Sequence, residues 1–322
     1  MDGKLAFIAL CIGILVLAWL GAGVLWRAAE VSEIVAPIER GSWEELTVMT
    51  LGTGNEYENP ERNGPSTAVA LGDDVLLVDS GRGLGEGLRS ARIPLDQPRI
   101  VLLTNLLPVN TMGLDDFLFT GWLVPRTEPL RVFGPPGTRT FVEALERAYA
   151  TGREALGGAL GLEAAGARIE VEEIEDTHRM QIGDLTVEAR ALPGGPVPTL
   201  AWRFSHDEHR IVISGSGWGA DVLASFAGRA DLLVHEAAYL PTVEELEGTG
   251  AEIPDPERIE REARLHTSIL DVGDIAREAQ VERLALVRLR PPPFFDLQIR
   301  SMVANDFEGS ILVPDDGEVI FP

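Results

Sequence analysis

The first apolar segment of the chain is long and carries no charge. It runs for 22 residues from Leu5 to Trp26 and is rich in leucine, isoleucine, alanine and valine. At a rise of about 1.5 Å per residue, a helix of this length spans the apolar core of a bilayer. We therefore predict a transmembrane anchor over residues 1–27. A cleaved signal sequence stays open as an alternative, because Ala28 and Ala29 place small residues directly after the apolar run.

Beyond a predicted linker at residues 28–45, which contains Pro37, the pattern changes to short apolar runs that alternate with helical patterns. These runs have the length and composition of strands that are buried inside a folded domain. We predict strands at Leu46–Leu51, Val75–Asp79, Ile100–Thr104, Leu130–Phe133, Ile211–Ser214, Leu232–His235 and Arg283–Val287.

Two of the intervening segments show an apolar stripe at helical spacing. One helix is predicted to start at Thr138 and the other near Thr267 or Ser268. Strands that alternate with helices indicate an α/β domain in which helices cover sheets. We expect this domain to occupy residues 46–322. The apolar positions of the two helices are Phe141, Leu145 and Tyr149 in the first, and Val272, Ile275, Ala276 and Ala279 in the second.

Short motifs follow one another along this domain in a characteristic order. They are Leu51-Gly52-Thr53-Gly54, Asp79-Ser80-Gly81-Arg82-Gly83, Gly113-Leu114-Asp115-Asp116, Gly134-Pro135-Pro136-Gly137-Thr138, Ser214-Gly215 and His235-Glu236-Ala237. In this order and spacing the chain resembles the metallo-beta-lactamase superfamily, and within it the ribonuclease Z and arylsulfatase-like branch. The resemblance implies an α/β fold, a four-layered αββα sandwich, here preceded by one transmembrane helix.

That family carries a metal-binding turn after its second apolar strand, with the pattern Thr-His-x-His-x-Asp-His. Leucine and valine have no lone pair to donate at such a position, and asparagine offers only a neutral oxygen. The resemblance places the turn's ligand positions on Asn105, Leu107, Val109 and Asn110. It places the remaining ligand positions on Gly194 (or its neighbour Gly195), Ser216 and Arg288.

We therefore expect neither a metal nor another cofactor. Changes outside the ligand set alone typically lower metal affinity about 10–100-fold, so replacement of the ligands themselves should abolish binding. The alternative is that metal ligands lie elsewhere in the chain. The sequence has five histidines, and none has the spacing of a metal-binding motif. His206 and His209 flank charged residues in a predicted turn, so we expect them to be solvated.

Glu236 and His266 match a second functional motif of the family. In ribonuclease Z-like enzymes these positions form a proton-donating pair beside the metals, so the resemblance places Glu236 next to His266. A histidine held by a carboxylate has a raised pKa and can deliver a proton. Without metal we expect the pair to be a relic and no residue to be catalytic. Two alternatives stay open: the pair only bridges core elements, or it forms a metal-free triad with Ser216.

Arg288 brings a positive charge to a former ligand position. Buried carboxylates need a counter-charge, since an unpaired charge is costly to bury. We expect a pocket lined by Asp79, Asp115, Ser216 and Arg288, with Arg288 paired to one of the two aspartates. Alternatively, Arg288 caps a strand end in solvent beside Arg290, because the prolines at 291–293 leave its direction open.

Charge adds information on partners and location. The chain has 51 acidic and 27 basic residues and a net charge of −24, a field that repels phosphate backbones. We therefore expect no nucleic acid partner. Charges on the two flanks of the apolar segment nearly balance. We favour a single pass through the inner (cytoplasmic) membrane with the domain on the outer, periplasmic side, and the cytoplasmic side stays open.

These observations predict a membrane-anchored, metal-free pseudoenzyme. It would serve as a binding or structural subunit of a membrane assembly. Its helix would hold it in the membrane, and its partners would be other membrane proteins or further copies of the chain. Two alternatives stay open. The first is a metal-dependent hydrolase of the phosphodiesterase, ribonuclease Z or arylsulfatase type, and the second is a small-molecule sensor that uses the emptied pocket.

Overall fold

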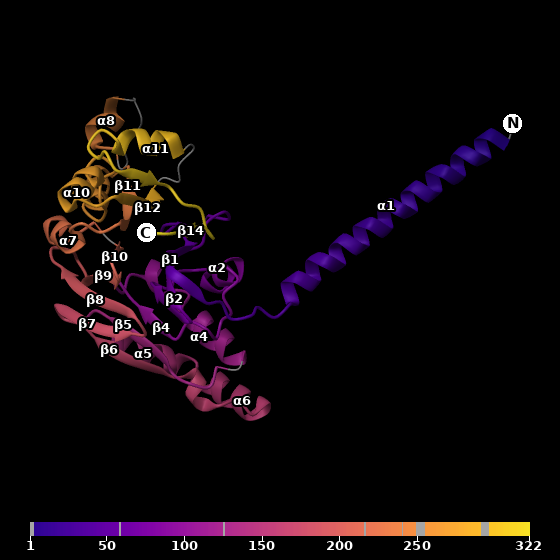
Figure 1. Ribbon diagram of the computed structural model, residues 1–322, viewed down its shortest axis with the longest axis horizontal. Helices are drawn as coiled ribbons and strands as arrows, with labels where there is room; N and C mark the ends of the chain where they lie inside the picture. The colour runs from indigo at the N-terminus through magenta and orange to yellow at the C-terminus, as the bar shows by residue number, and fades with distance from the viewer. Residues whose placement is uncertain are drawn as a thin grey trace. The chain divides into compact units, whose positions relative to one another are not determined.

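The computed structural model describes residues 3–57, 59–124, 126–215, 217–239, 241–248, 255–290 and 296–322. The chain forms two compact units, Met1–Glu39 and Arg40–Pro322. The first unit contains the single helix α1 (Gly3–Val35), drawn in indigo in Figure 1. Large apolar side chains along it, such as Leu15, Leu17 and Trp19, are exposed. Among the described residues, α1 is the one helix long and apolar enough to cross a bilayer. It continues to Val35, into the stretch expected to be a linker.

The described residues of the second unit contain two seven-stranded sheets (Figure 1). Their strand orders are β14-β1-β2-β3-β4-β5-β6 and β13-β12-β11-β10-β9-β8-β7. Each sheet is antiparallel on one side and parallel on the other, where β3 to β6 and β10 to β13 run together. The strands are β1 (Trp43–Gly52), β2 (Ser66–Gly72), β3 (Asp74–Val78), β4 (Ile100–Leu102), β5 (Leu130–Gly134), β6 (Ile169–Glu173), β7 (Thr177–Ile182), β8 (Leu185–Leu192), β9 (Thr199–His206), β10 (His209–Ser214), β11 (Leu232–Ala238), β12 (Arg283–Arg290), β13 (Ser310–Leu312) and β14 (Val319–Ile320).

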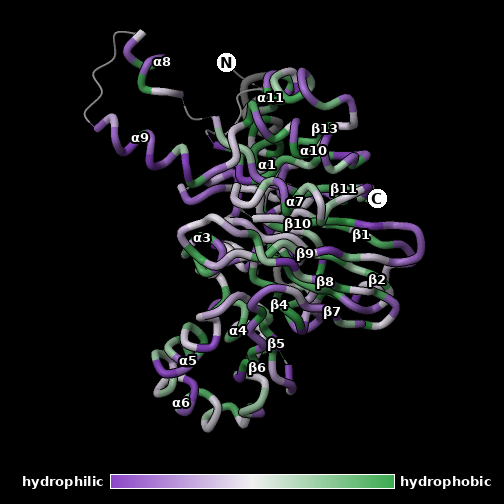
Figure 2. The backbone as a smooth tube through the Cα atoms, turned by 90° about the vertical axis from the view of Figure 1, so that its left-hand side faces the viewer, coloured by the Kyte–Doolittle hydropathy of each residue, from purple (hydrophilic) through white to green (hydrophobic). Residues whose placement is uncertain are grey.

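Helices cover the outer face of each sheet. On the first sheet, α2, α4 and α5 bury apolar side chains against the strands, and on the second sheet α7, α10 and α11 do so. The remaining helices lie in the connections, and Figure 2 shows that α9 among them is largely hydrophilic. The helices are α2 (Leu84–Ser90), α3 (Pro108–Thr111), α4 (Leu114–Leu123), α5 (Thr138–Ala148), α6 (Ala150–Leu160), the 3-10 helix η1 (Ala164–Ala167), α7 (Ala220–Ala227), α8 (Val243–Gly248), α9 (Pro256–Ala263), α10 (Val272–Ala279) and α11 (Asp296–Val303).

The inner faces of the two sheets pack on each other. Trp202 and Phe204 of β9 meet Phe133 of β5 and Val78 of β3 in one buried cluster. The layers are therefore helix, sheet, sheet and helix, which confirms the predicted αββα sandwich. Gly137, with φ 103°, precedes α5, so Thr138 is the first residue of that helix and does not cap it.

Candidate functional site

The carboxyl ends of the parallel strands of both sheets meet at one edge of the sandwich. Thr104, just after β4, accepts a backbone hydrogen bond from Leu200 of β9, and Trp202 Nε1 donates to the Leu103 carbonyl at 3.2 Å. These bonds join the two sheets where the strands end. In open α/β sheets, ligands bind outside the carboxyl ends of the strands, and the residues of interest for function gather here.

Asp79 and Arg288 form a buried ion pair at this edge. Arg288 Nη2 lies 2.5 Å from Asp79 Oδ2, and the two side chains are 10% and 1% exposed. The backbone N–H of Thr104 donates to Asp79 Oδ1 at 2.8 Å, and the Thr104 hydroxyl lies within 3.0 Å of both carboxylate oxygens. Burial raises the pKa of Asp79, while the Arg288 charge and the hydrogen bonds from Thr104 oppose this rise.

Backbone geometry directs both members of the pair. Asp79 has φ 61° and Arg288 has φ 56°, values in the left-handed region that few non-glycine residues adopt. The pairing of β11 with β12 shifts register between Glu236 and Ala238, opposite Val287 and Arg290. Such a bulge re-aims a side chain. Arg288 therefore turns inward to Asp79 and is not a solvated strand cap.

The turn after β4 supplies a polar half and an apolar half. Asn105 and Asn110 are fully buried, and Asn110 Nδ2 donates to Asn105 Oδ1 at 2.6 Å. Asn110 Oδ1 in turn accepts a hydrogen bond from Arg288 Nη1 at 2.7 Å. Leu107 and Val109 lie on the other half and line a cleft. The turn thus binds Arg288 through the side-chain amide of Asn110 and lines the cleft with the apolar side chains of Leu107 and Val109.

The other expected positions do not all join this network. Gly194 lies on the exposed loop after β8, with φ 96°. Asp115 lies on α4, where its carboxylate accepts a hydrogen bond from the Tyr149 hydroxyl, so it is not a partner of Arg288. Ser216 falls outside the described residues, and the triad hypothesis therefore stays a prediction. His206 and His209 face each other in the β9–β10 hairpin, and His209 is largely solvated.

Glu236 and His266 lie together, as the resemblance implies. His266 Nδ1 donates to Glu236 Oε2 at 2.9 Å, and the two side chains are 18% and 5% exposed. Burial lowers the pKa of His266, but the hydrogen bond and negative charge of Glu236, with help from Glu56, outweigh burial and raise it. His235 differs, because its full burial lowers its pKa and its Nε2 lies 2.8 Å from the Thr267 hydroxyl. The pKa is therefore shifted in opposite directions at the two histidines, upward at His266 and downward at His235.

A cleft of about 590 Å³ opens beside His266. Most of its wall is apolar, and its polar groups gather around Arg290. That arginine forms ion pairs with Glu56 and Glu262, and its Nη1 lies 3.5 Å from His266 Nε2. The lining residues are Asn55, Glu56, Tyr57, Gly64, Arg82, Leu107, Pro108, Val109, Met112, Pro196, Trp218, Glu262, Leu265, His266 and Arg290.

Sequence reasoning did not assign Arg82, Glu56, Glu262 or Arg290 to the site. Arg82 lies in the motif that begins at Asp79, shortly after the end of a predicted strand. This position could have indicated that Arg82 belongs to the site. Glu56 and Glu262 are 206 positions apart and carry no local signal; only the fold brings both to Arg290.

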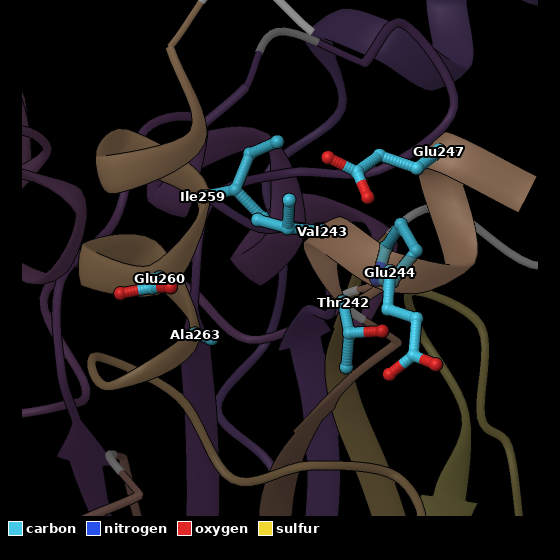
Figure 3. Close-up of a pocket in the computed structure, with 8 residues that line it drawn as sticks. Thr242, Val243, Glu244, Glu247, Ile259, Glu260 and Ala263 are labelled. Atoms are coloured by element: carbon cyan, nitrogen blue, oxygen red, sulfur yellow. The ribbon is translucent and has the colours of Figure 1, made fainter. Parts of the chain in front are cut away.

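A second hollow, of about 450 Å³, lies between α8 and α9 (Figure 3). Its charged lining residues are Glu244, Glu247 and Glu260, beside the apolar Val243 and Ile259. The described lining contains no histidine, arginine or lysine, so this hollow offers no acid–base pair. The cleft beside His266 is therefore the better candidate for a functional site.

The residues at the strand ends do not fit the metal centre that the fold family implies. Within the described ranges, no group of three or more histidine, cysteine, aspartate or glutamate side chains could hold a metal ion. The Arg288 guanidinium contacts Asp79, and hydrocarbon occupies two of the positions in the turn. A divalent cation needs several converging oxygen, nitrogen or sulfur donors, which this arrangement does not provide.

No protein-family model matches the chain, but individual proteins do. It is similar to ribonuclease Z from Mycobacterium sp. (strain KMS), with 30% identity over 279 residues that cover 84% of this chain and 94% of the relative. Ribonuclease Z from Mycobacterium bovis (strain BCG / Pasteur 1173P2) is 30% identical over 284 residues, covering 84% and 96%.

Solved structures show the same fold. The metallo-beta-lactamase fold protein YhfI from Bacillus subtilis matches with a TM-score of 0.66 and 18% identity, covering 87% of this chain and 100% of its own. The short form of human tRNase Z matches with a TM-score of 0.64 and 19% identity, covering 86% and 99%.

These relatives correct two expectations. The prediction of a metal-free pseudoenzyme that serves as a subunit of a membrane assembly is wrong, because the relatives along the whole domain are ribonucleases, and the alternative of a ribonuclease Z-like hydrolase agrees better. The prediction took the replacement of the family's metal-ligand positions for the loss of function, although the Glu236–His266 pair is present.

The exclusion of nucleic acid partners is wrong as well. Net charge sums over the whole surface and does not decide what a cleft containing Arg82 and Arg290 can bind. Identity of 30% over nearly the full length of the relatives, together with the shared fold, shows that the chain belongs to the ribonuclease Z family of metallo-beta-lactamase fold proteins.

Proposed function

We propose that the chain is a hydrolase of the ribonuclease Z type, which cleaves a phosphodiester in the cleft beside His266. The hydrogen bond of 2.9 Å between His266 Nδ1 and Glu236 Oε2, at the wall of that cleft, carries the proposal. A histidine whose pKa is raised above its ordinary value is protonated to a greater extent at a given pH and can act as a general acid. Glu236 orients the ring. As a water molecule attacks the phosphorus and the bond from phosphorus to the leaving oxygen breaks, Nε2 delivers its proton to that oxygen, and the attacking water releases a proton to the solvent.

The charge in the cleft suits a phosphate group. Arg82 and Arg290 both line it, and guanidinium groups bind phosphate oxygens with two parallel hydrogen bonds. Arg290 is held by Glu56 and Glu262, and it lies 4.8 Å from the centre of the Tyr57 ring. These contacts restrict the arginine to one orientation, so less side-chain entropy is lost when a phosphate binds.

RNA is the substrate class that we propose, on the strength of the names of the relatives. The aromatic side chains of the cleft support it. Tyr57, which lines the cleft, is 50% exposed. Unpaired bases stack on such rings at about 1–3 kcal/mol per base. The bases of a single-stranded 3′ end would contact the apolar wall of the cleft, while its phosphates would contact the arginines.

The proposal is tested by incubating the full-length chain in detergent with a tRNA precursor that carries a 3′ extension. His266→Ala should lower the cleavage rate by a factor of about 10²–10⁴, the usual contribution of a general acid. His209→Ala, a histidine on the exposed hairpin, is the matched control and should keep the rate. Absence of cleavage by the unchanged chain, both with and without added divalent cations, would overturn the proposal.

The apolar wall also favours a second candidate. Leu107, Pro108, Val109 and Met112 form a continuous hydrocarbon surface, to which a phosphate backbone contributes little contact. A small ligand with an apolar body and one anionic end would match both parts of the cleft. Saturation with such a ligand would raise the melting temperature without any cleavage of RNA.

We also propose that α1 anchors the chain in a membrane, in keeping with its length and its exposed apolar side chains. From the sequence alone we favour a single pass in the cytoplasmic membrane with the unit Arg40–Pro322 on the outer side. Cleavage of a tRNA precursor requires the cytoplasmic side instead, which the sequence leaves open. Accessibility of an added protease to the unit Arg40–Pro322 in sealed cells distinguishes the two sides.

A further inference from the structure

We infer that Arg288 is the permanent cation of this site and stands in place of the metal ions of the family. This goes beyond the proposed function, because it states what holds the positive charge at the strand ends whatever the substrate. The inference starts from the disagreement between the fold family, which implies metals, and the donor set found here.

The guanidinium is fully engaged on the side that faces the strand ends. Its Nη2 donates to Asp79, and its Nη1 donates to Asn110 Oδ1 at 2.7 Å and to the Gly215 carbonyl at 2.9 Å. The backbone N–H of Arg288 donates to the Thr53 carbonyl at 2.8 Å. One carboxylate, one amide and one carbonyl thus surround the cation, which resembles the oxygen shell of a metal.

The same contacts leave no room for a second cation. Both oxygens of Asp79 accept hydrogen bonds from Thr104, and Oδ2 also contacts Arg288. A divalent ion would have to displace these bonds while standing beside a fixed positive charge. It would find no compensating ligand at Leu107 or Val109, whose side chains offer no lone pair.

The backbone angles of Asp79 and Arg288 support this inference. Asp79 and Arg288 both have positive φ, and their side chains meet each other. Each such residue costs on the order of 1–3 kcal/mol and persists only where its surroundings hold it. Here the ion pair joins two residues that both take such backbone values.

Metal content of the full-length chain is the first test. The chain is purified in detergent, incubated with excess zinc and manganese chloride, freed of unbound ions by gel filtration and subjected to elemental analysis. We expect less than about 0.1 equivalent of metal, because the converging ligands are missing. Retention of one or more equivalents per chain would overturn the inference.

A double-mutant cycle is the second test. Arg288→Met leaves the buried Asp79 without its counter-charge, so the folding equilibrium constant should fall by about 10² or more. Adding Asp79→Asn should restore most of the loss, because no unpaired charge then remains. Arg99→Met, which breaks an exposed ion pair with Glu128, is the matched control and should change stability little.

The cycle remains informative if Arg288→Met does not fold. Recovery of folding in the double variant would then support the inference, and a melting curve of Arg288→Met like that of the control would oppose it. If neither variant folds, the metal content of the unchanged chain decides. A chain that binds no metal and cleaves no RNA would overturn the proposed function alone, whereas one that binds metal and cleaves RNA would overturn this inference alone.

Discussion

His266 has a buried partner on one side and the cleft on the other. Its Nδ1 bonds to Glu236, which is 5% exposed, while the residue lines the cleft together with Arg290. This arrangement explains why the same residue type behaves differently at positions 235 and 266. His235 has a hydroxyl partner and no counter-charge within hydrogen-bond reach, so burial decides its protonation.

The raised pKa of His266 predicts a pH dependence of folding stability. A histidine whose pKa is higher in the folded than in the unfolded state adds stability that is complete below the unfolded value of 6.5. That contribution is lost as the pH rises through the folded pKa. Relative to His266→Asn, the melting temperature of the unchanged chain should therefore fall as the pH rises from about 6 to about 9.

The comparison with His266→Asn removes the effect of other groups. His235 has a lowered pKa and acts in the opposite direction, reducing stability as the pH falls below 6.5. Because both chains contain His235, its effect cancels in the difference. A difference in melting temperature that stays constant with pH would show that the Glu236 contact does not stabilise the charged ring.

Sequence reasoning reached some of these residues and missed others for a physical reason. It placed Asp79 and Arg288 near each other but could not choose between Asp79 and Asp115, since either could be buried. Asp79 directly follows a strand that is buried on both faces, whereas Asp115 lies in the first turn of α4. Arg290 and Glu56 are ordinary charged residues in sequence, and only the tertiary fold shows that they face a cleft.

Among the strands, several that are buried on both faces were predicted, whereas β2, which is buried from Ser66 to Leu71, was missed. The structure contains all seven predicted strands. They could be predicted because their sequences consist mainly of apolar residues. The strands that were not predicted lie mainly in the antiparallel parts. In β7, for example, the residues alternate between exposed and half-buried, and the sequence Thr177-His178-Arg179-Met180-Gln181-Ile182 gives no apolar run. One face of such a strand meets water, which hides it from a search for buried segments.

The loop that carries Asp79 is held against α3 and α4 by close backbone contacts. Ser80 N donates to the Asn110 carbonyl, and Gly113 N donates to the Ser80 carbonyl, each at 2.8 Å. A Cβ at Gly113 would lie 2.2 Å from the Gly81 carbonyl oxygen. Gly113→Ala should therefore cost about 3 kcal/mol, since one backbone segment must move away from the other.

Gly158 in α6 is the matched control for that substitution. A Cβ there meets no heavy atom within 4 Å, and the residue lies inside a helix. Gly158→Ala should raise stability by about 0.5–1 kcal/mol, because alanine loses less backbone entropy in a helix. Thermal unfolding of both variants is the measurement. Equal effects of the two substitutions would show that the contact around Gly113 is not as close as described.

At the scale of the whole molecule, the acidic surface and the arginines of the cleft have different roles. A net charge of −24 repels nucleic acid at most of the surface. Binding of RNA then depends on the few arginines of the cleft. The prediction that nucleic acid is excluded used the net charge of the whole chain, whereas binding depends on the local electrostatic field in the cleft.

The anchor proposal predicts the behaviour of the chain in cell fractions. The full-length chain should sediment with membranes and remain there after washing at alkaline pH, which removes proteins held only by charge. Removal of residues 1–39 should release the remaining unit to the soluble fraction, because α1 carries the exposed apolar side chains. Extraction of the full-length chain by alkaline washing alone would contradict the proposal. Removal of α1 in the cell by cleavage on its C-terminal side, as for a signal sequence, would contradict it as well.

The most direct test of the central claim is the cleavage rate before and after removal of metal ions by a chelator. A chromogenic phosphodiester is used beside the tRNA precursor, since RNA itself needs divalent ions to fold. Because His266 supplies the proton and the strand ends lack converging metal ligands, we predict that the full-length chain hydrolyses the chromogenic phosphodiester at a rate unchanged within about twofold by the chelator. We also predict that His266→Ala loses this activity. Loss of activity in the chelator, with recovery on addition of zinc, would contradict the account.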